Sequence, residues 1–193
     1  MNDKPLNTCS KETCNDCDIH SKITCHFNPG QILRFYLIFS PPFITGSIGI
    51  HNYSSDFFII WVMMTGLFFL LAGIRVLCTH CPHYNEPSAI LKCWVNYGIP
   101  KLWKYRPVPM NILEKAILIS GFIIIWCYPV IFISLTGKWI LLSGYIFSVA
   151  LFFILLNLFQ CRRCINISCP FNRVSSKVKE EFIRNNCHSQ FRK

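Results

Sequence analysis

Four apolar runs constrain the folding of this 193-residue chain more than any other feature of its sequence. A helix that crosses a bilayer needs about 20 consecutive apolar residues, because its backbone polar groups must be satisfied within the segment. Runs of this length lie at 31–51, 57–77, 112–135 and 139–160. With 52% hydrophobic and only 15% charged residues, the chain is expected to be a small membrane protein with several spans.

The first run differs from the other three. Arg34 lies near its start, and Pro41 and Pro42 interrupt its middle. Because proline removes a backbone N–H donor, a helix that contains this pair is expected to kink. We predict a membrane helix over 31–51, with a re-entrant or interfacial segment as the alternative.

The spacing of the runs predicts two helical hairpins. Only residues 52–56 separate the first two runs, and only residues 136–138 separate the last two. The three longer polar segments, which are 1–30, 78–111 and 161–193, then fall on one side of the membrane.

The basic residues indicate which side this is. Of the 19 lysines and arginines, Lys138 alone falls in a connection on the opposite side. Membrane proteins carry their excess of Lys and Arg in cytoplasmic loops. We therefore expect an integral protein of the cell membrane with both termini in the cytoplasm. Its parts are a cysteine-rich tail (1–30), a first hairpin (31–77), a cytoplasmic loop (78–111), a second hairpin (112–160) and a cysteine-rich tail with a short helix (161–193).

Eleven of the twelve cysteines lie in the three polar segments that are expected to be cytoplasmic. Cys127 alone lies within an apolar run, where a small buried apolar side chain is the simplest interpretation. Cytoplasmic cysteines with C-x-x-C spacing are typical of metal ligands or redox groups rather than of disulfides. The expected fold is therefore an all-α membrane protein. Four transmembrane helices form two hairpins, and each hairpin is followed by a cytoplasmic cysteine-rich metal-binding motif.

The first motif follows the second apolar run and reads Cys78-Thr-His-Cys81-Pro. Its two sulfurs can share one ion if the backbone turns between them, and Pro82 favours such a turn. With Cys93 included, the loop has one thiolate fewer than a four-cysteine site. His80 or His83 could supply the fourth ligand, or a cysteine could come from another segment. For either histidine, an interfacial polar side chain is the alternative interpretation.

The second motif, Cys161-Arg-Arg-Cys164, follows the fourth run and is succeeded by Cys169-Pro170. A short helix that begins at Ser175 or Ser176 would carry the last cysteine of the chain back toward this motif. We predict that four cysteines of this segment form the most complete metal site of the chain. They are Cys161, Cys164, Cys169 and Cys187.

A third group of cysteines lies in the first tail. Its C-x4-C-x2-C spacing resembles that of plant-type ferredoxins, and the Cys-Pro of the second motif is similar to the end of the bacterial ferredoxin pattern. Both likenesses cover short stretches and imply iron–sulfur ligation. The second motif has C-x2-C-x4-C-P spacing, which departs from the C-x2-C-x2-C-x3-C-P run of bacterial ferredoxins. A tail that binds no metal is the alternative for Cys9, Cys14, Cys17 and Cys25.

The apolar runs contain no Asp, Glu, Lys, Arg or His near the membrane centre. Pumps and transporters of charged substrates usually keep such residues, and a membrane b-type haem needs paired histidines. The helices are therefore expected to anchor and scaffold the cysteine motifs. The stretch 94–110 mixes aromatic and basic residues, which suits the headgroups of the lipid bilayer, and a nucleic-acid partner is not expected.

Together these features favour a membrane-anchored iron–sulfur protein that faces the cytoplasm and transfers electrons. It would exchange them with a soluble or membrane redox partner or a quinone, as a carrier or accessory subunit rather than a complete enzyme. The main alternative is a membrane scaffold or assembly protein whose cytoplasmic loops are held by zinc, without catalysis. Metal or thiol trafficking is a third possibility, and thiolate ligands suit both iron and zinc.

Overall fold

The computed structural model describes residues 8, 19 and 22–189, and in these residues the fold is helical without a β-strand. Four helices are long and apolar enough to cross a membrane, as the sequence predicts. The elements are α1 (Pro29–His51), α2 (Ser55–Leu67), a π-helical turn (Phe68–Gly73), α3 (Ile74–Val76), α4 (Ile112–Leu135), α5 (Trp139–Phe159) and α6 (Ser176–Ser189).

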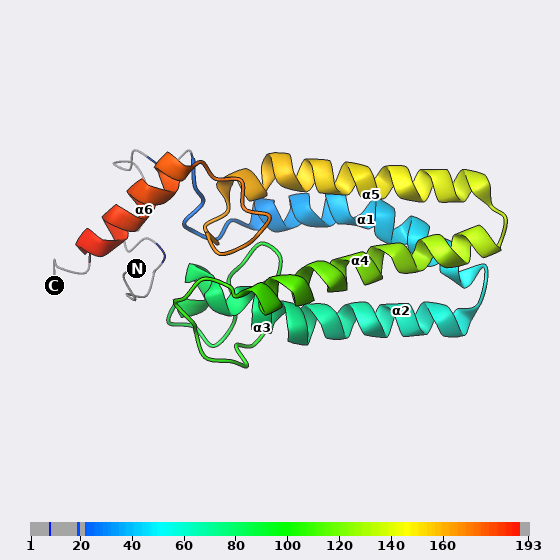
Figure 1. Ribbon diagram of the computed structural model, residues 1–193, viewed down its shortest axis with the longest axis horizontal. Helices are drawn as coiled ribbons and strands as arrows, with labels where there is room; N and C mark the ends of the chain where they lie inside the picture. The colour runs from blue at the N-terminus through cyan, green and yellow to red at the C-terminus, as the bar shows by residue number, and fades with distance from the viewer. Residues whose placement is uncertain (1–7, 9–18, 20–21, 190–193) are drawn as a thin grey trace.

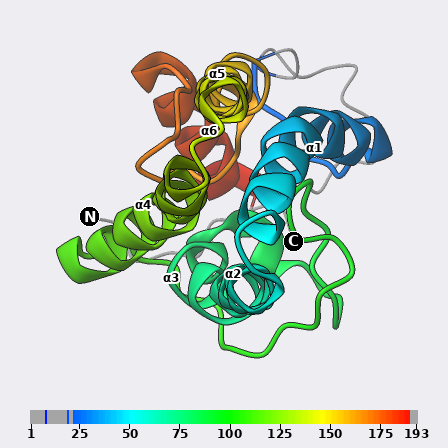
Figure 2. The ribbon, with the colours of Figure 1, turned by 90° about the vertical axis from the view of Figure 1, so that its right-hand side faces the viewer.

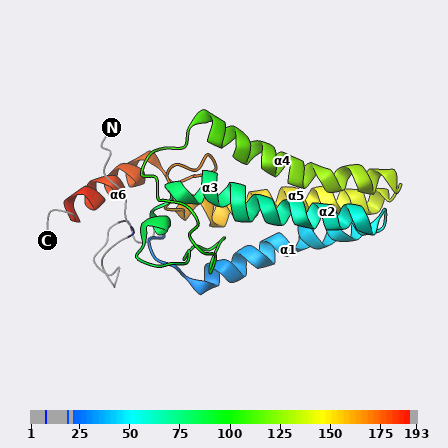
Figure 3. The ribbon, with the colours of Figure 1, turned by 90° about the horizontal axis from the view of Figure 1, so that it is seen from below.

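The long helices form one elongated bundle (Figures 1 and 3). Residues 52–54 connect α1 to α2, and residues 136–138 connect α4 to α5, both at the same end of the bundle. The loop between α3 and α4, the segment after α5 and α6 lie at the opposite end. The chain is therefore two antiparallel hairpins whose long polar segments gather at one end.

Helix α1 runs without interruption through Pro41 and Pro42, so residues 29–51 form one helix rather than a re-entrant segment. Pro41 cannot donate a hydrogen bond to the carbonyl of Leu37, and the hydroxyl of Ser40 donates to this carbonyl instead (3.3 Å). The helix changes direction along its length (Figure 2). A local side-chain hydrogen bond thus compensates for the backbone bond that proline removes, as a bilayer requires.

A second proline, Pro129, lies inside α4 and leaves the carbonyl of Ile125 without its usual helical donor. The indole N–H of Trp61, from α2, donates to this carbonyl (3.0 Å). The hydroxyl of Tyr145, from α5, donates to the next carbonyl along α4, that of Trp126 (2.8 Å). Both donor side chains are buried. The proline-containing turn of α4 is therefore bonded to a helix on each side.

Glycines allow the helices to approach closely at two places. A Cβ at Gly49 of α1 would overlap Ile133 of α4, and one at Gly121 of α4 would overlap the ring of Phe68. Small residues at such contacts let helix backbones approach in a membrane, where close packing replaces the hydrophobic driving force. The α1–α4 contact therefore depends on the missing side chain at Gly49.

We predict that Gly49→Ala destabilises the bundle by about 1–3 kcal/mol, because Ile133 must move to admit the added methyl group. Gly144→Ala is the matched control, since a Cβ there meets no atom within 4 Å. Thermal unfolding of the two purified variants in the same detergent measures the difference. Equal midpoints would show that the α1–α4 contact is looser than described.

The polar end of the molecule has a small core of its own. Ile23 from the first tail packs with Ile165 and with Val178 and Phe182 of α6. The backbone N–H of Thr24 donates to the carbonyl of Arg163 (2.8 Å). The segments before α1 and after α5 are therefore packed together at the end of the bundle.

Candidate functional site

The two C-x-x-C motifs adopt the same local structure at the ends of two membrane helices. A one-turn 3-10 helix covers Cys78–His80 after α3, and another covers Cys161–Arg163 after α5. The residue that follows is extended in both, with φ −90° and ψ 137° at Cys81 and φ −74° and ψ 128° at Cys164. Side chains three residues apart eclipse in a 3-10 helix, so each turn presents its two cysteines on one side.

Cys93 is positioned by a narrow loop between Leu91 and Ile99. The N–H of Leu91 donates to the carbonyl of Ile99 (2.8 Å), and the N–H of Gly98 donates to the carbonyl of Leu91 (2.9 Å). Gly98 has φ 83°, a left-handed conformation that glycine adopts without steric penalty. This closed loop brings Cys93 back to the first motif.

Cys169 is positioned by hydrogen bonds from asparagine side chains. Nδ2 of Asn172 donates to the carbonyls of Cys164 (2.8 Å) and Asn166 (2.9 Å), which closes the segment between the second and third cysteines of this half. Nδ2 of Asn166 in turn donates to the carbonyl of Leu77, just before the first motif (3.1 Å). This last bond joins the two halves of the site directly.

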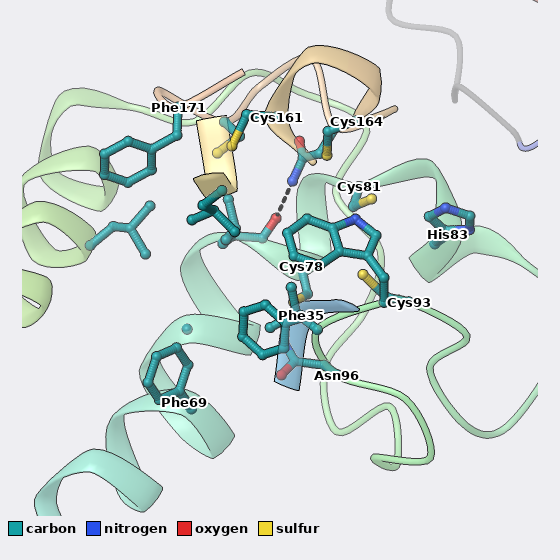
Figure 4. Close-up of a pocket in the computed structure, with 18 of the residues that line it drawn as sticks. Phe35, Phe69, Cys78, Cys81, His83, Cys93, Asn96, Cys161, Cys164 and Phe171 are labelled. Carbon is teal, nitrogen blue, oxygen red and sulfur yellow. Dashed lines mark hydrogen bonds between the residues drawn. The ribbon is translucent and has the colours of Figure 1, made fainter. Parts of the chain in front are cut away.

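The two motifs line a single cavity of about 120 Å³ at the end of the bundle (Figure 4). Three cysteines come from the first hairpin and its loop, and three come from the segment after the second hairpin. They are Cys78, Cys81, Cys93, Cys161, Cys164 and Cys169. The sequence predicts two separate sites, whereas the structure brings these six side chains around one space.

Aromatic and aliphatic side chains form the rest of the cavity wall. Phe35 of α1, Phe152 of α5 and Phe122 of α4 lie on the side toward the bundle, and Trp94 and Phe171 come from the loops. Phe35 and Trp94 meet edge to face, with ring centroids 5.6 Å apart. The six sulfurs therefore face a space with apolar walls.

Four of the six sulfurs share one hydrogen-bonding pattern. Each accepts a bond from the backbone N–H two residues further along the chain. The pairs are Cys81 with His83, Cys93 with Val95, Cys164 with Asn166, and Cys169 with Phe171. Cys78 differs, because Nδ2 of Asn96 donates to its sulfur (3.2 Å). Such bonds stabilise a sulfur that carries negative charge.

Burial raises the pKa of Cys81 above its ordinary value of about 9, and the charges of Cys93 and Cys164 raise it further. Burial likewise raises the pKa of Cys164, and the charge of Cys169 adds to the effect. The pKa values of Cys93 and Cys169 are also raised by burial, against the opposing effect of their N–H bonds. Without a cation in the cavity, these groups are therefore neutral thiols at pH 7.

The two candidate histidines have different surroundings. Nδ1 of His80 lies 2.6 Å from the carbonyl of Val108, and Nε2 lies 3.2 Å from a carboxylate oxygen of Glu114. Nε2 makes no hydrogen bond in spite of this distance, and His80 lies beside the ion pair of Arg106 with Glu114. His83 instead lines the cavity, and its Nδ1 lies 2.9 Å from Glu86. A carboxylate partner on one ring nitrogen is typical of metal-bound histidines, so His83 is the better candidate ligand.

Among the remaining predicted ligands, the structure describes the side chain of Cys25 alone. Cys25 is buried in the core formed with Ile23 and α6. Cys187 belongs to α6, which leads away from the bundle (Figures 1 and 3), and its side chain lies outside the described residues. Cys9, Cys14 and Cys17 also lie outside them, so their assignment stays a prediction. Cys127 is exposed on α4, and the expectation that it is buried is wrong.

In the part of the chain that the structure describes, no three His, Cys, Asp or Glu side chains are arranged to hold a single metal ion. In these residues the structure therefore does not show the metal-binding motifs that the sequence predicts. The six sulfurs line a volume instead of meeting at one point.

Comparison with protein families, with curated proteins and with solved structures finds no match to this chain.

We predict that alkylation of Cys81, Cys93, Cys164 and Cys169 in the folded metal-free protein stays slow through pH 9, where the thiols of the unfolded chain already react. The raised pKa values keep these thiols protonated in the folded state, whereas the unfolded chain loses its protons near pH 9. The folded state is therefore also less stable as the pH rises above 9. Iodoacetamide labelling followed by peptide mass spectrometry gives the rate at each cysteine.

The same protein unfolded in denaturant supplies the reference rate for each peptide. If the four cysteines of the folded protein reacted at pH 7 as fast as this reference, the enclosed cavity would be ruled out.

Proposed function

We propose that this protein is a membrane-anchored electron carrier in which four of the six cavity cysteines hold an iron–sulfur centre at the cytoplasmic surface. The observation that carries the proposal is the convergence of six thiols around one cavity of about 120 Å³. A single zinc ion takes four ligands, with sulfurs about 2.3 Å away. Six sulfurs spread around such a volume suit a centre with several metal atoms better than they suit one ion.

The surroundings of the sulfurs support a redox role. Backbone N–H groups point at four of them, and hydrogen bonds to sulfur raise the reduction potential of iron–sulfur centres. The cavity walls are mostly apolar, and the polarity around an iron–sulfur centre also tunes its potential. Ligands of this kind therefore both hold a centre and adjust how readily it accepts an electron.

The position of the cavity also supports electron transfer. Two of its cysteine pairs directly follow α3 and α5, so the cavity lies at the ends of helices that are long enough to cross a membrane. A single electron can enter there from a soluble donor protein and leave to a membrane partner or a quinone. The helices carry no buried histidine pair for a haem in the described residues, so the partner supplies any further carrier. This favours a carrier or accessory subunit over a complete enzyme.

A zinc-held scaffold is the second candidate, and one observation favours it. The six cysteines come from the loop after the first hairpin and from the segment after the second, so metal bound between them would tie the two halves together. Six thiolates can hold two zinc ions, as they do in Zn₂Cys₆ modules. In that case the metal would stabilise the loops for a partner and perform no chemistry.

We predict that protein purified without oxygen is brown, contains iron and acid-labile sulfide, and gives a paramagnetic signal after dithionite reduction or ferricyanide oxidation. Elemental analysis and electron paramagnetic resonance check these three properties together. Two zinc ions per chain in a colourless preparation would instead establish the scaffold.

We further predict that Cys81→Ser and Cys164→Ser each lose most of the bound metal. Cys81 belongs to the first motif and Cys164 to the second, so both losses are expected if the two motifs share one centre. Cys127→Ser is the matched control, since this cysteine is exposed on α4 and should leave the metal content unchanged. Metal content per folded chain is the measurement. If the control lost as much metal as the two variants, the cavity would not be the binding site.

The proposal places the cavity, the central loop and both termini in the cytoplasm, following the distribution of lysine and arginine. We predict that Lys104→Cys is protected from a membrane-impermeant maleimide on intact cells and reacts after lysis. Lys138→Cys, at the other end of the bundle, should react on intact cells. The reverse pattern would invert the topology and place the cysteines in an oxidising compartment.

A further inference from the structure

A second hollow lies at the polar end of the bundle, outside the cysteine cavity. It has a volume of about 270 Å³, and its wall carries four cations: Lys22, Arg162, Arg163 and Arg173. These residues come from three segments that are far apart in the sequence, namely the part before α1, the turn after α5 and the stretch before α6. The fold, and not a run of charge in the sequence, brings them together.

The four cations have no carboxylate partner among the residues that the structure describes. The ion pairs found there involve His80, His83 and Arg106, all on other parts of the molecule. No Asp or Glu lines the hollow. Like charges held this close repel one another, and an anion between them relieves that repulsion.

The hollow is built on a firm frame. Backbone hydrogen bonds join Thr24 to Arg163 (2.8 Å) and Arg173 to Cys161 (3.0 Å), which holds the three segments side by side. Val174 and Val178 form its apolar floor and are themselves buried. The backbone that carries the cations is therefore fixed before any ligand arrives, so binding orders little beyond the cationic side chains.

The depth of the hollow relative to the bilayer indicates the ligand. Helix α5 has 21 residues and so spans about 30 Å, which matches the hydrocarbon core. Arg162 and Arg163 follow it within four residues, at the level of the lipid phosphates. Arg34 of α1 lies over the ring of Phe159, the last residue of α5, and marks the same level (5.7 Å to the ring centroid).

We propose that this hollow binds the phosphate group of an anionic phospholipid. Guanidinium groups bind phosphate oxygens in pairs, and three arginines around one concave space can surround a single phosphate. A hollow of this size suits one headgroup, whereas an acidic protein would need a broad flat surface. Basic pockets beside membrane helices on the cytoplasmic side bind phospholipid headgroups in the same way.

The test measures lipid retained by the full-length protein in a non-ionic detergent, using native mass spectrometry. Phosphatidylglycerol and phosphatidylcholine are offered separately at equal concentration, and inorganic phosphate is added as a soluble competitor in a third arm. We expect one phosphatidylglycerol to be retained and phosphatidylcholine to be lost, because the choline cation beside its phosphate is repelled by the four cations of the hollow. Excess inorganic phosphate should displace the lipid if the phosphate group is what the hollow recognises.

The variants Arg163→Gln and Arg173→Gln should each weaken phosphatidylglycerol binding about tenfold, which is the usual effect of losing one charged hydrogen-bond partner. Arg173→Lys keeps the charge but loses the paired donors, so it should weaken binding less than Arg173→Gln. Lys104→Gln removes an exposed charge from the central loop, outside the hollow, and should leave binding unchanged. The midpoint of thermal unfolding in the same detergent serves as the folding check in all variants.

Equal losses in Lys104→Gln and Arg173→Gln would overturn the proposal, because attraction would then follow net charge and not this site. Equal retention of the two lipids by the unaltered protein would overturn it as well. Displacement by inorganic phosphate at low concentration, with no preference between the lipids, would assign the hollow to a free phosphate instead. None of these outcomes depends on whether the cysteine cavity binds iron, zinc or no metal.

Discussion

The exclusion of water from the bilayer is the constraint on which the rest of this structure depends. A carbonyl that loses its helical donor there has to find another, and Pro129 creates such a carbonyl at Ile125. The donor is the indole of Trp61, which belongs to a different helix. Satisfying the backbone of α4 therefore also sets how α2 and α4 lie against each other. Tyr145 does the same between α4 and α5 through the carbonyl of Trp126.

This arrangement determines where the helices end and hence where the cysteines meet. The π-helical turn (Phe68–Gly73) and α3 extend the second span to the first motif, and α5 leads directly into the second. Each span ends in the same 3-10 turn, so each presents a pair of sulfurs on one side. The bond from Asn166 to Leu77 then holds the two ends together. One local structure, used twice, thus encloses one shared cavity.

The sequence predicts the elements of this site better than it predicts their assembly. Neighbouring residues determine the spans, the turns at the C-x-x-C motifs and the capping of α4 by Asn111 with Glu114. These features can therefore be predicted from short stretches of sequence. The meeting of Cys81 with Cys164 joins positions more than 80 residues apart, and no local pattern contains it. The loop of the first motif has only three cysteines, and this shortage of a fourth was the one available signal that a cysteine of another segment lies beside them. The position of His80 beside Glu114 could not be predicted from a local pattern either, because Glu114 belongs to α4.

The charge of the cavity links metal binding to the fold. Six thiolates could not remain ionised together within apolar walls, because burial and mutual repulsion both favour the neutral thiol. The empty cavity therefore holds protonated sulfur, and a metal centre that binds there has to release those protons. Because the six cysteines come from both halves of the chain, a metal bound among them would also hold the central loop against the segment after α5.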